Sequence, residues 1–165
     1  MGILLGKGKN MKKQILFLLI VALLIGCKST GGSISSFKDV IGKELKLVEV
    51  QIDSTPFNRI VIYDRADLKK HKHDVYTLNF TNDTISGTAA PNKYSAPYTA
   101  GDNNTLTINL IRSTLMAPIV QPEKLQENDF YNYMQKVERW SAEKGKLILH
   151  SKTESGIAVR LIFAL

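Results

Sequence analysis

The chain of 165 residues contains one cysteine, Cys27, and the residues around it define the clearest chemistry in the sequence. Residues 15–25 form an uninterrupted apolar run, and Gly26 separates this run from the cysteine. Two lysines stand close before the run, at 11–13, and the chain turns polar directly after the cysteine. A basic start, a short apolar middle and a small residue at the cut are the layout of a secretory signal. The sequence therefore predicts that residues 1–26 are removed during export.

Leu24-Ile25-Gly26-Cys27 resembles the lipobox of bacterial lipoproteins. The resemblance implies that Cys27 receives a diacylglycerol and that acyl chains such as palmitate anchor the exported chain in the bacterial cell envelope. By analogy the outer membrane is preferred over the inner one, because Lys28 and not an aspartate follows the cysteine. Met11 is a better start than Met1, since it is followed at once by lysines.

The apolar run has two alternative interpretations, an uncleaved membrane anchor and a buried strand. Its eleven residues are too few to cross the hydrocarbon layer of roughly 30 Å, which needs about 20 residues in a helix. Residues 27–41 are mostly small and polar, so they are predicted to form a flexible tether that carries the lipidated Cys27. Residues 42–165 are predicted to form one domain.

Composition limits the partners of the mature chain. The predicted cleavage removes four lysines and lowers the formal net charge from +7 to +3. A mild surplus of this kind is no nucleic-acid footprint, which requires a clustered basic face. A single acylated cysteine leaves no disulfide to form, so packing must stabilise the domain. The expected partners are therefore membrane lipid, through Cys27, and an unidentified envelope protein or ligand, with no nucleic acid.

Two short motifs invite an assignment to metal binding or catalysis. His71-x-His73 could place two imidazoles on one face of a strand, but three neighbouring lysines repel a dication and no further ligand lies close in sequence. Ser113-Thr114 could supply a nucleophile, but no general base is marked near it. The sequence thus predicts no catalytic residue, no metal site and no cofactor, and a protein that is not an enzyme.

Stretches rich in apolar and β-branched residues predict short strands, with turns between them. These stretches lie at residues 45–52, 60–63, 76–80 and 84–87, and turns are expected at 53–56 and 82–83. Tyr94 and Tyr98 lie in a segment that leads to a turn at 101–104. Leu106, Ile108 and Leu110 alternate so regularly with polar residues that all three are predicted to face the core.

One amphipathic helix is predicted from Gln121-Pro122-Glu123, because proline suits the first turn and glutamate complements the positive helix end. Its apolar stripe, with spacings of three and four, comprises Leu125, Phe130, Tyr133, Met134, Val137 and Trp140. A closing hairpin is predicted over 146–151 and 157–163. The fold class is therefore α+β: a mainly antiparallel, partly barrel-like sheet with one helix packed on it.

An ordered set of residues accompanies these elements. The set comprises Gly87, Asn92, Tyr94, Tyr98, Ser113, Thr114, Met116, Glu123, Leu147, Leu149, Leu161 and Phe163. With its gaps, it resembles the pattern of the META domain (HslJ-like) family over roughly residues 42–165. The family's Gly-Cys-Asn is here the longer, cysteine-free 87–92, so a thiol role at this place is lost. The resemblance implies a divergent member with an envelope or stress-related role.

For several of the matched residues, a structural role is the simplest interpretation. Gly87 would permit a tight bend, and Asn92 would bridge a loop through its amide. Ser113 and Thr114 would bind backbone groups where the chain leaves the sheet.

Three functions remain open. In the first, a tethered, non-enzymatic domain binds or supports an envelope component, with Asn92, Tyr94, Tyr98, Ser113 and Thr114 as the candidate surface. In the second, the domain carries a small molecule or lipid between sheet and helix. In the third, Ser113 or Thr114 serves a hydrolase.

Overall fold

The computed structural model of the chain describes residues 34–55, 58–66, 75–116 and 123–165. All of them belong to one compact unit, Gly32–Leu165. The signal segment 1–26, Cys27 and the His71-x-His73 pair lie outside the described residues, and what the sequence predicts for them stays a prediction.

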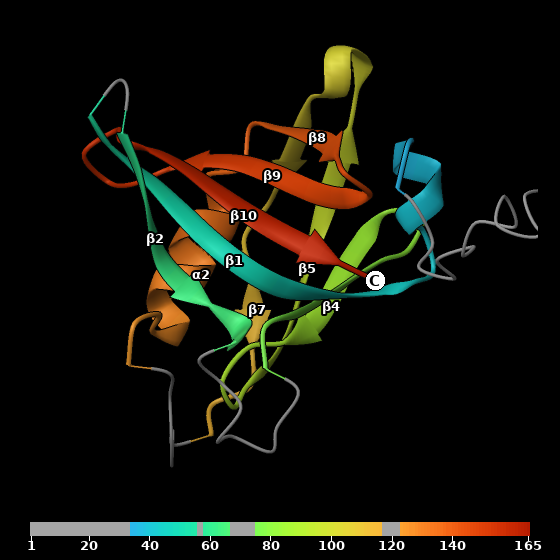
Figure 1. The fold of residues 1–165 in the computed structure, drawn as a ribbon. Helices are drawn as coiled ribbons and strands as arrows, with labels where there is room; N and C mark the ends of the chain where they lie inside the picture. Colours follow the sequence, from blue (N-terminus) through green and yellow to red (C-terminus); the bar gives the residue numbers. More distant parts are fainter. Residues whose placement is uncertain (1–33, 56–57, 67–74, 117–122) are drawn as a thin grey trace, which may run out of the picture. The chain divides into compact units, whose positions relative to one another are not determined.

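Ten strands in one antiparallel sheet and a single α-helix make up the described part of this unit (Figure 1). The strands are β1 (Glu44–Thr55), β2 (Asn58–Asp64), β3 (Thr77–Phe80), β4 (Thr84–Thr88), β5 (Lys93–Ala100), β6 (Leu106–Ile108), β7 (Arg112–Ser113), β8 (Arg139–Glu143), β9 (Lys146–Lys152) and β10 (Ala158–Ala164). The helix is α2 (Glu127–Gln135), and two 3₁₀ turns are η1 (Phe37–Val40) and η3 (Asp102–Asn104). The predicted α+β class is confirmed.

The sheet curves far enough for its two ends to meet at one point. Its strand order is β6-β5-β4-β3-β1-β10-β9-β8, with β2 added to β1 and β7 added to β5. The amide of Leu106 in β6 donates to the carbonyl of Glu138, just before β8, at 3.0 Å. Thr105 and Arg139 form an isolated bridge at the same place. A single bridge is not a ladder, so the sheet is barrel-like without being closed.

Aromatic side chains fill the inside of the curved sheet. Phe37 packs against Phe80 and Trp140, with ring centroids 5.0 and 5.3 Å apart. Under the helix, Phe130 packs against Tyr76 at 5.0 Å and Tyr94 at 5.6 Å. These rings occupy the space between sheet and helix in which the carrier hypothesis placed a ligand.

The core extends further toward the N-terminus than the sequence predicts. Ile34 is 3 % exposed and Val40 is fully buried, and both belong to the main hydrophobic cluster. Ser36 opens η1 with a capping box that includes Asp39, so the chain is already ordered by its own hydrogen bonds here. The expectation of a flexible tether up to residue 41 is therefore wrong for residues 34–41.

The predicted hairpins and their inward residues are confirmed, with small changes in extent. β3 pairs with β4, and β9 pairs with β10, with Leu149 opposite Leu161. Asp53–Thr55, expected in a turn, instead continue β1 and pair with β2. The segment 93–100, expected only as a connection, is β5, a strand that pairs with β4, β6 and β7.

Leu106 and Ile108 face the core as predicted, but Leu110 is 72 % exposed. Alternation alone predicted its burial, whereas burial requires the strand to continue. The ladder between β6 and β5 ends with Ile108 opposite Tyr98. The next residue of β5 is Pro97, which has no N–H to donate, and the chain leaves the sheet at this point.

The helix is shorter than the apolar stripe suggested. It begins at Glu127, not near Glu123, and ends at Gln135. Trp140 is buried as expected, but it lies on β8 opposite Leu149. The reason is the turn that follows: Lys144 and Gly145 have positive φ values of 50° and 75°, the geometry of a two-residue hairpin turn. Such a turn requires a strand on both sides.

Gly87 does not form a bend but lies within β4, opposite Tyr94. A Cβ atom at this position would stand 2.1 Å from the carbonyl oxygen of Thr77 and 2.9 Å from the ring of Tyr94. Glycine is required because the tyrosine ring passes directly over the strand to reach β3.

Candidate functional site

The candidate surface is built around Asn92, which closes the irregular stretch between β4 and β5. Its side-chain amide donates to the carboxylate of Glu127 at 2.7 Å and to the carbonyl of Met116 at 3.3 Å. Its side-chain oxygen accepts from the Thr114 hydroxyl at 2.8 Å and from the Met116 amide at 2.7 Å. The expectation that Asn92 bridges a loop through its amide is confirmed.

Glu127 occupies the first turn of α2 and is only 8 % exposed. Its Oε1 atom accepts from the backbone amides of Ala90 at 3.2 Å and Asn92 at 3.1 Å, and from the Tyr131 hydroxyl at 3.1 Å. The positive end of the helix favours a carboxylate at this position. We call Asn92, Thr114, Glu127 and Tyr131 the polar brace, because together they join the β4–β5 loop to the chain after β7 and to α2.

Burial and the adjacent carboxylate of Glu127 raise the pKa of Tyr131 above its usual range. The phenol therefore stays protonated and donates to the carboxylate, as the hydrogen bond requires. The sequence had assigned the helix-opening role to Glu123, which lies in an exposed turn. Two acidic residues in the first turn, Glu127 and Asp129, are the signal that would have indicated where the helix begins.

Tyr94 and Tyr98 are part of the core and not of an open surface. Both rings are buried, and their hydroxyls donate to the carbonyls of Thr77 and Thr81, each at 2.7 Å. Burial raises the pKa of both tyrosines. Of the five predicted surface residues, the structure brings together Asn92, Tyr94, Ser113 and Thr114, whereas Tyr98 lies further along β5, opposite Ile108. Only Ser113 and Thr114 are exposed.

Ser113 and Thr114 lie at the end of β7 and just beyond it, where the chain leaves the sheet. Thr114 exchanges backbone and side-chain hydrogen bonds with Lys93 and donates its hydroxyl to Asn92. The expected backbone-binding role is thus confirmed for Thr114. His150, the one histidine of the described ranges, bonds to Ser141 on β8 and not to this pair. The brace holds its polar groups against each other, which is an arrangement for rigidity.

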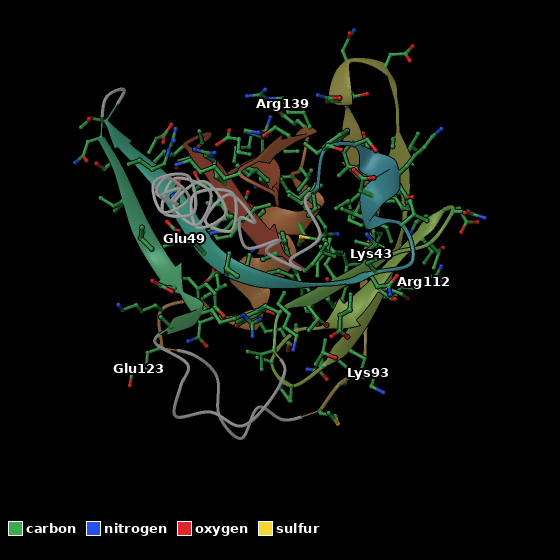
Figure 2. The ribbon with its side chains drawn as sticks, turned by 45° about the vertical axis from the view of Figure 1, so that its right-hand side comes forward. Lys43, Glu49, Lys93, Arg112, Glu123 and Arg139 are labelled. Carbon is green, nitrogen blue, oxygen red and sulfur yellow. The ribbon has the colours of Figure 1, made fainter. Side chains whose placement is uncertain are left out.

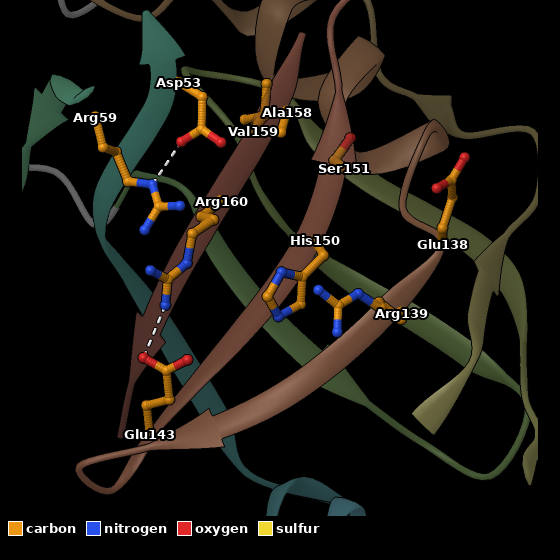
Figure 3. A pocket seen from close by; sticks show the side chains of 10 residues that line it. All are labelled: Asp53, Arg59, Glu138, Arg139, Glu143, His150, Ser151, Ala158, Val159 and Arg160. Carbon is orange, nitrogen blue, oxygen red and sulfur yellow. Dashed lines mark hydrogen bonds and ion pairs between the residues drawn. The ribbon is translucent and has the colours of Figure 1, made fainter. Parts of the chain in front are cut away.

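A second polar region lies on the outer face of the sheet, where the structure has a groove with a volume of about 450 Å³. Figure 3 shows it from close by. We call it the arginine groove, and it is lined by Asp53, Arg59, Glu138, Arg139, Glu143, His150, Ser151, Ala158, Val159 and Arg160. These residues lie on or next to β1, β2, β8, β9 and β10. In the strand order these are neighbouring strands at one end of the sheet, so the groove forms only when all of them are paired.

His150 stands in the middle of this groove. Its ring nitrogen Nε2 is 2.8 Å from the Ser141 hydroxyl. Burial is the main cause that lowers its pKa to about 4, and the positive charges of Arg139 and Arg160 add to the effect, against Glu143. The imidazole is therefore neutral at pH 7, between arginines on the two neighbouring strands.

Sequence reasoning did not find the groove, although a signal for it exists. Leu149 and Leu161 are predicted to point inward, so His150 and Arg160, their neighbours in the chain, must point outward. The missing information was the position of Arg139, because β8 was interpreted as the end of the helix. Without that strand, three basic residues distant in sequence could not be placed side by side.

Residues 34–55, 58–66, 75–116 and 123–165 contain no group of three or more His, Cys, Asp or Glu side chains that could hold a metal ion.

No helix of the part that the structure describes is long and apolar enough to cross a bilayer.

The curved antiparallel sheet with one helix and an internal polar brace defines an α+β domain. The family model of the META domain matches residues 50–161, which is more than half of the chain, and the chain belongs to the META domain family. The match includes both the brace and all of the residues that line the arginine groove, from Asp53 to Arg160.

Two solved structures are similar to this chain. One is the NMR structure of a protein from Burkholderia xenovorans, with a TM-score of 0.53, 14 % identity, and coverage of 85 % of this chain and 97 % of the other. The other is the crystal structure of a DUF4847 family protein from Bacteroides vulgatus, with a TM-score of 0.49, 14 % identity, and coverage of 76 % and 93 %. The first supports the fold alone. The search of the curated proteins finds no match.

Proposed function

We propose that this protein is a lipid-anchored, non-enzymatic binding module of the bacterial cell envelope, whose META domain binds or supports a component near the membrane surface. One observation carries the non-enzymatic part. In the polar brace, Asn92 and Glu127 direct their hydrogen-bonding groups at each other and at neighbouring backbone groups. A catalytic pair requires a nucleophile within reach of a free base. In the brace the Thr114 hydroxyl donates to the side-chain oxygen of Asn92, and the Glu127 carboxylate accepts from the amides of Ala90 and Asn92.

The envelope part rests on the lipobox-like sequence that ends in Cys27. The folded core begins by Ile34, seven residues after the cysteine. Seven residues span at most about 25 Å when fully extended. A domain anchored at Cys27 would therefore stay close to the bilayer, and its partner would be sought at the membrane surface. A diacylglycerol with a third acyl chain would anchor such a domain firmly, since one chain gives only marginal binding.

The anchor is tested by fractionating cells that express the full chain with Cys27 or with Cys27→Ala. We expect the Cys27 form in the membrane fraction after a high-salt wash, with a mass increase that corresponds to acyl chains, and the Cys27→Ala form released. Recovery of Cys27→Ala in the washed membranes would contradict the proposed anchor.

The non-enzymatic role is tested by the double substitution Ser113→Ala, Thr114→Ala. We expect the variant to retain the biological activity of the chain, with at most a modest loss of stability from the Thr114 hydrogen bond to Asn92. Loss of the activity in a fully folded variant would support the hydrolase hypothesis instead.

A further inference from the structure

Three basic side chains stand side by side across three neighbouring strands of the arginine groove. Arg160 on β10 is opposite His150 on β9, and His150 is opposite Arg139 on β8. Residues directly opposite in an antiparallel ladder have neighbouring side chains on the same face of the sheet. Because His150 is neutral at pH 7, the row places one uncharged ring between two arginines.

The arginines of the groove use little of their hydrogen-bonding capacity within the protein. Arg59 binds Asp53 through Nε at 2.6 Å, and Arg160 binds Glu143 through one terminal nitrogen at 2.8 Å. An arginine has five N–H donors. Among the described residues, the Nε atom of Arg160 is buried without a partner, and Arg139 makes no side-chain hydrogen bond or ion pair.

The three carboxylates of the groove balance its three arginines in formal charge, but their pairing leaves one arginine without a partner among the described residues. Asp53 and Glu143 are engaged by Arg59 and Arg160. Glu138 is bound by Lys152, whose side chain is not part of the lining. Arg139 therefore remains as the uncompensated charge, next to a neutral imidazole. Figure 3 shows Arg59, Arg160, His150 and Arg139 following one another across the strands.

We propose that the arginine groove binds the phosphate group of a phosphorylated small molecule or lipid headgroup, with Arg139 and Arg160 as its main ligands and Arg59 at the rim. A phosphate offers several oxygens in a tetrahedral arrangement, which donors from separate strands can approach from different sides. A carboxylate is planar and can meet one arginine fork. Asp53 and Glu143 each bind only one nitrogen of their arginine and leave its other donors for a ligand. The volume of about 450 Å³ is in the range of small-ligand sites.

The inference is independent of the lipid anchor, since no residue of the groove is near Cys27 in sequence and the binding is to be measured in solution. His150 gives a direct readout. A phosphate beside the imidazole would favour its charged form and offset the effect of Arg139 and Arg160, so the pKa of His150 should rise when the groove is occupied.

The test is a titration of the full chain with inorganic phosphate, followed by NMR of the histidine ring protons. The chain has three histidines, and His71 and His73 serve as internal references. We expect a saturable shift at His150, a rise of its pKa, and at least about tenfold weaker binding in Arg139→Gln and Arg160→Gln. Arg112→Gln is the matched control. Arg112 is exposed on β7, outside the groove, and Figure 2 shows it well separated from Arg139.

A second arm distinguishes the source of the phosphate. The same variants are compared for binding to phosphatidylglycerol and to phosphatidylcholine vesicles. Only the difference between variants counts, because any anchor is common to all of them. If Arg139→Gln loses binding of inorganic phosphate but keeps binding to phosphatidylglycerol vesicles, the result supports a soluble phosphate compound. Loss of phosphatidylglycerol binding in the same variant supports a lipid headgroup. If neither titration depends on Arg139, or if Arg112→Gln has the same effect, the proposal is wrong.

Discussion

The polar brace and the arginine groove are both rich in hydrogen-bonding side chains, yet they use them in opposite ways. In the brace, a buried carboxylate and a buried amide bond to each other and to the loops around them. In the groove, arginines on neighbouring strands face an open volume with most of their donors unused. Buried polar groups that are fully bonded rigidify a fold. Donors around a groove that have no partner in the described part of the protein support the proposed ligand site there. The comparison teaches that spare hydrogen-bonding capacity, and not polarity, separates a binding surface from a structural one.

The largest expected effect comes from removing Glu127, the residue at the centre of the brace. Glu127→Ala would leave two buried backbone amides and the side chain of Asn92 without their acceptor. We expect a loss of about 3–4 kcal/mol in the free energy of unfolding, because unpaired buried donors bear the full desolvation cost. Urea unfolding measures the change. Glu123→Ala, the same substitution at an exposed position four residues earlier, should have little effect. Equal losses in both variants would show that Glu127 is not a brace.

A smaller but still large effect is expected at Gly87→Ala, where β4 supports the residues that lead into the brace. The new methyl group would meet the Thr77 carbonyl and the Tyr94 ring, so either the strand or the ring must move. We expect a destabilisation of about 2–3 kcal/mol, typical of overpacking in a close-packed core. Tyr94→Phe, which keeps the ring and removes only the hydroxyl bond to Thr77, should cost about 1 kcal/mol. A Gly87→Ala protein as stable as the wild type would contradict the close approach.

In the groove, the expected effect on stability depends on pH. The pKa of His150 is lowered to about 4 in the folded chain, against about 6.5 unfolded. As the pH falls below about 6.5, His150 takes up a proton in the unfolded chain before it does in the folded chain. The free energy of unfolding therefore decreases as the pH falls from about 6.5 to about 4, and the contribution of His150 is fully present above this range. Because the ring is partly exposed, we expect a loss on the order of 1 kcal/mol. His150→Gln should remove this part of the pH dependence, and an unchanged pH profile would show that the imidazole does not cause it.

The smallest effect on stability is expected for Arg139→Gln. The side chain is exposed and makes no ion pair with the described residues, so the free energy of unfolding should change by less than about 0.5 kcal/mol. The pKa of His150 should rise above its wild-type value, because one of the charges that lower it is gone. NMR titration of the histidine measures this shift. A marked destabilisation would mean that Arg139 is a structural residue and would remove the contrast with the brace.

Local patterns predicted much of the fold and one part of the brace. The closing hairpin followed from the inward alternation of Leu147, Leu149 and Leu161, and Asn92 was expected to bridge a loop. The hairpin depends on pairing between segments close in sequence, whereas the partners of Asn92 lie 22 to 35 residues away and could not be named from the local pattern. Leu110 was mispredicted because the end of the β6 ladder is set by Pro97 on another strand.

The groove could not be predicted for a related reason. Val137 and Trp140 continue the helical spacing of Phe130 and Met134, so local periodicity favoured a helix through Arg139. Residues 139–143 form a strand instead, because they pair with β9. This pairing is a tertiary interaction that outweighs the local preference. A basic row assembled from three strands is visible only once their register is known.

The most direct test of the account compares phosphate affinity in two variants of the full chain, Arg139→Gln in the groove and Ser113→Ala beside the brace. We predict that Arg139→Gln loses at least about tenfold in affinity while Ser113→Ala binds as the wild type does. Unchanged binding in Arg139→Gln, together with a loss in Ser113→Ala, would place the binding surface at the brace and contradict the account.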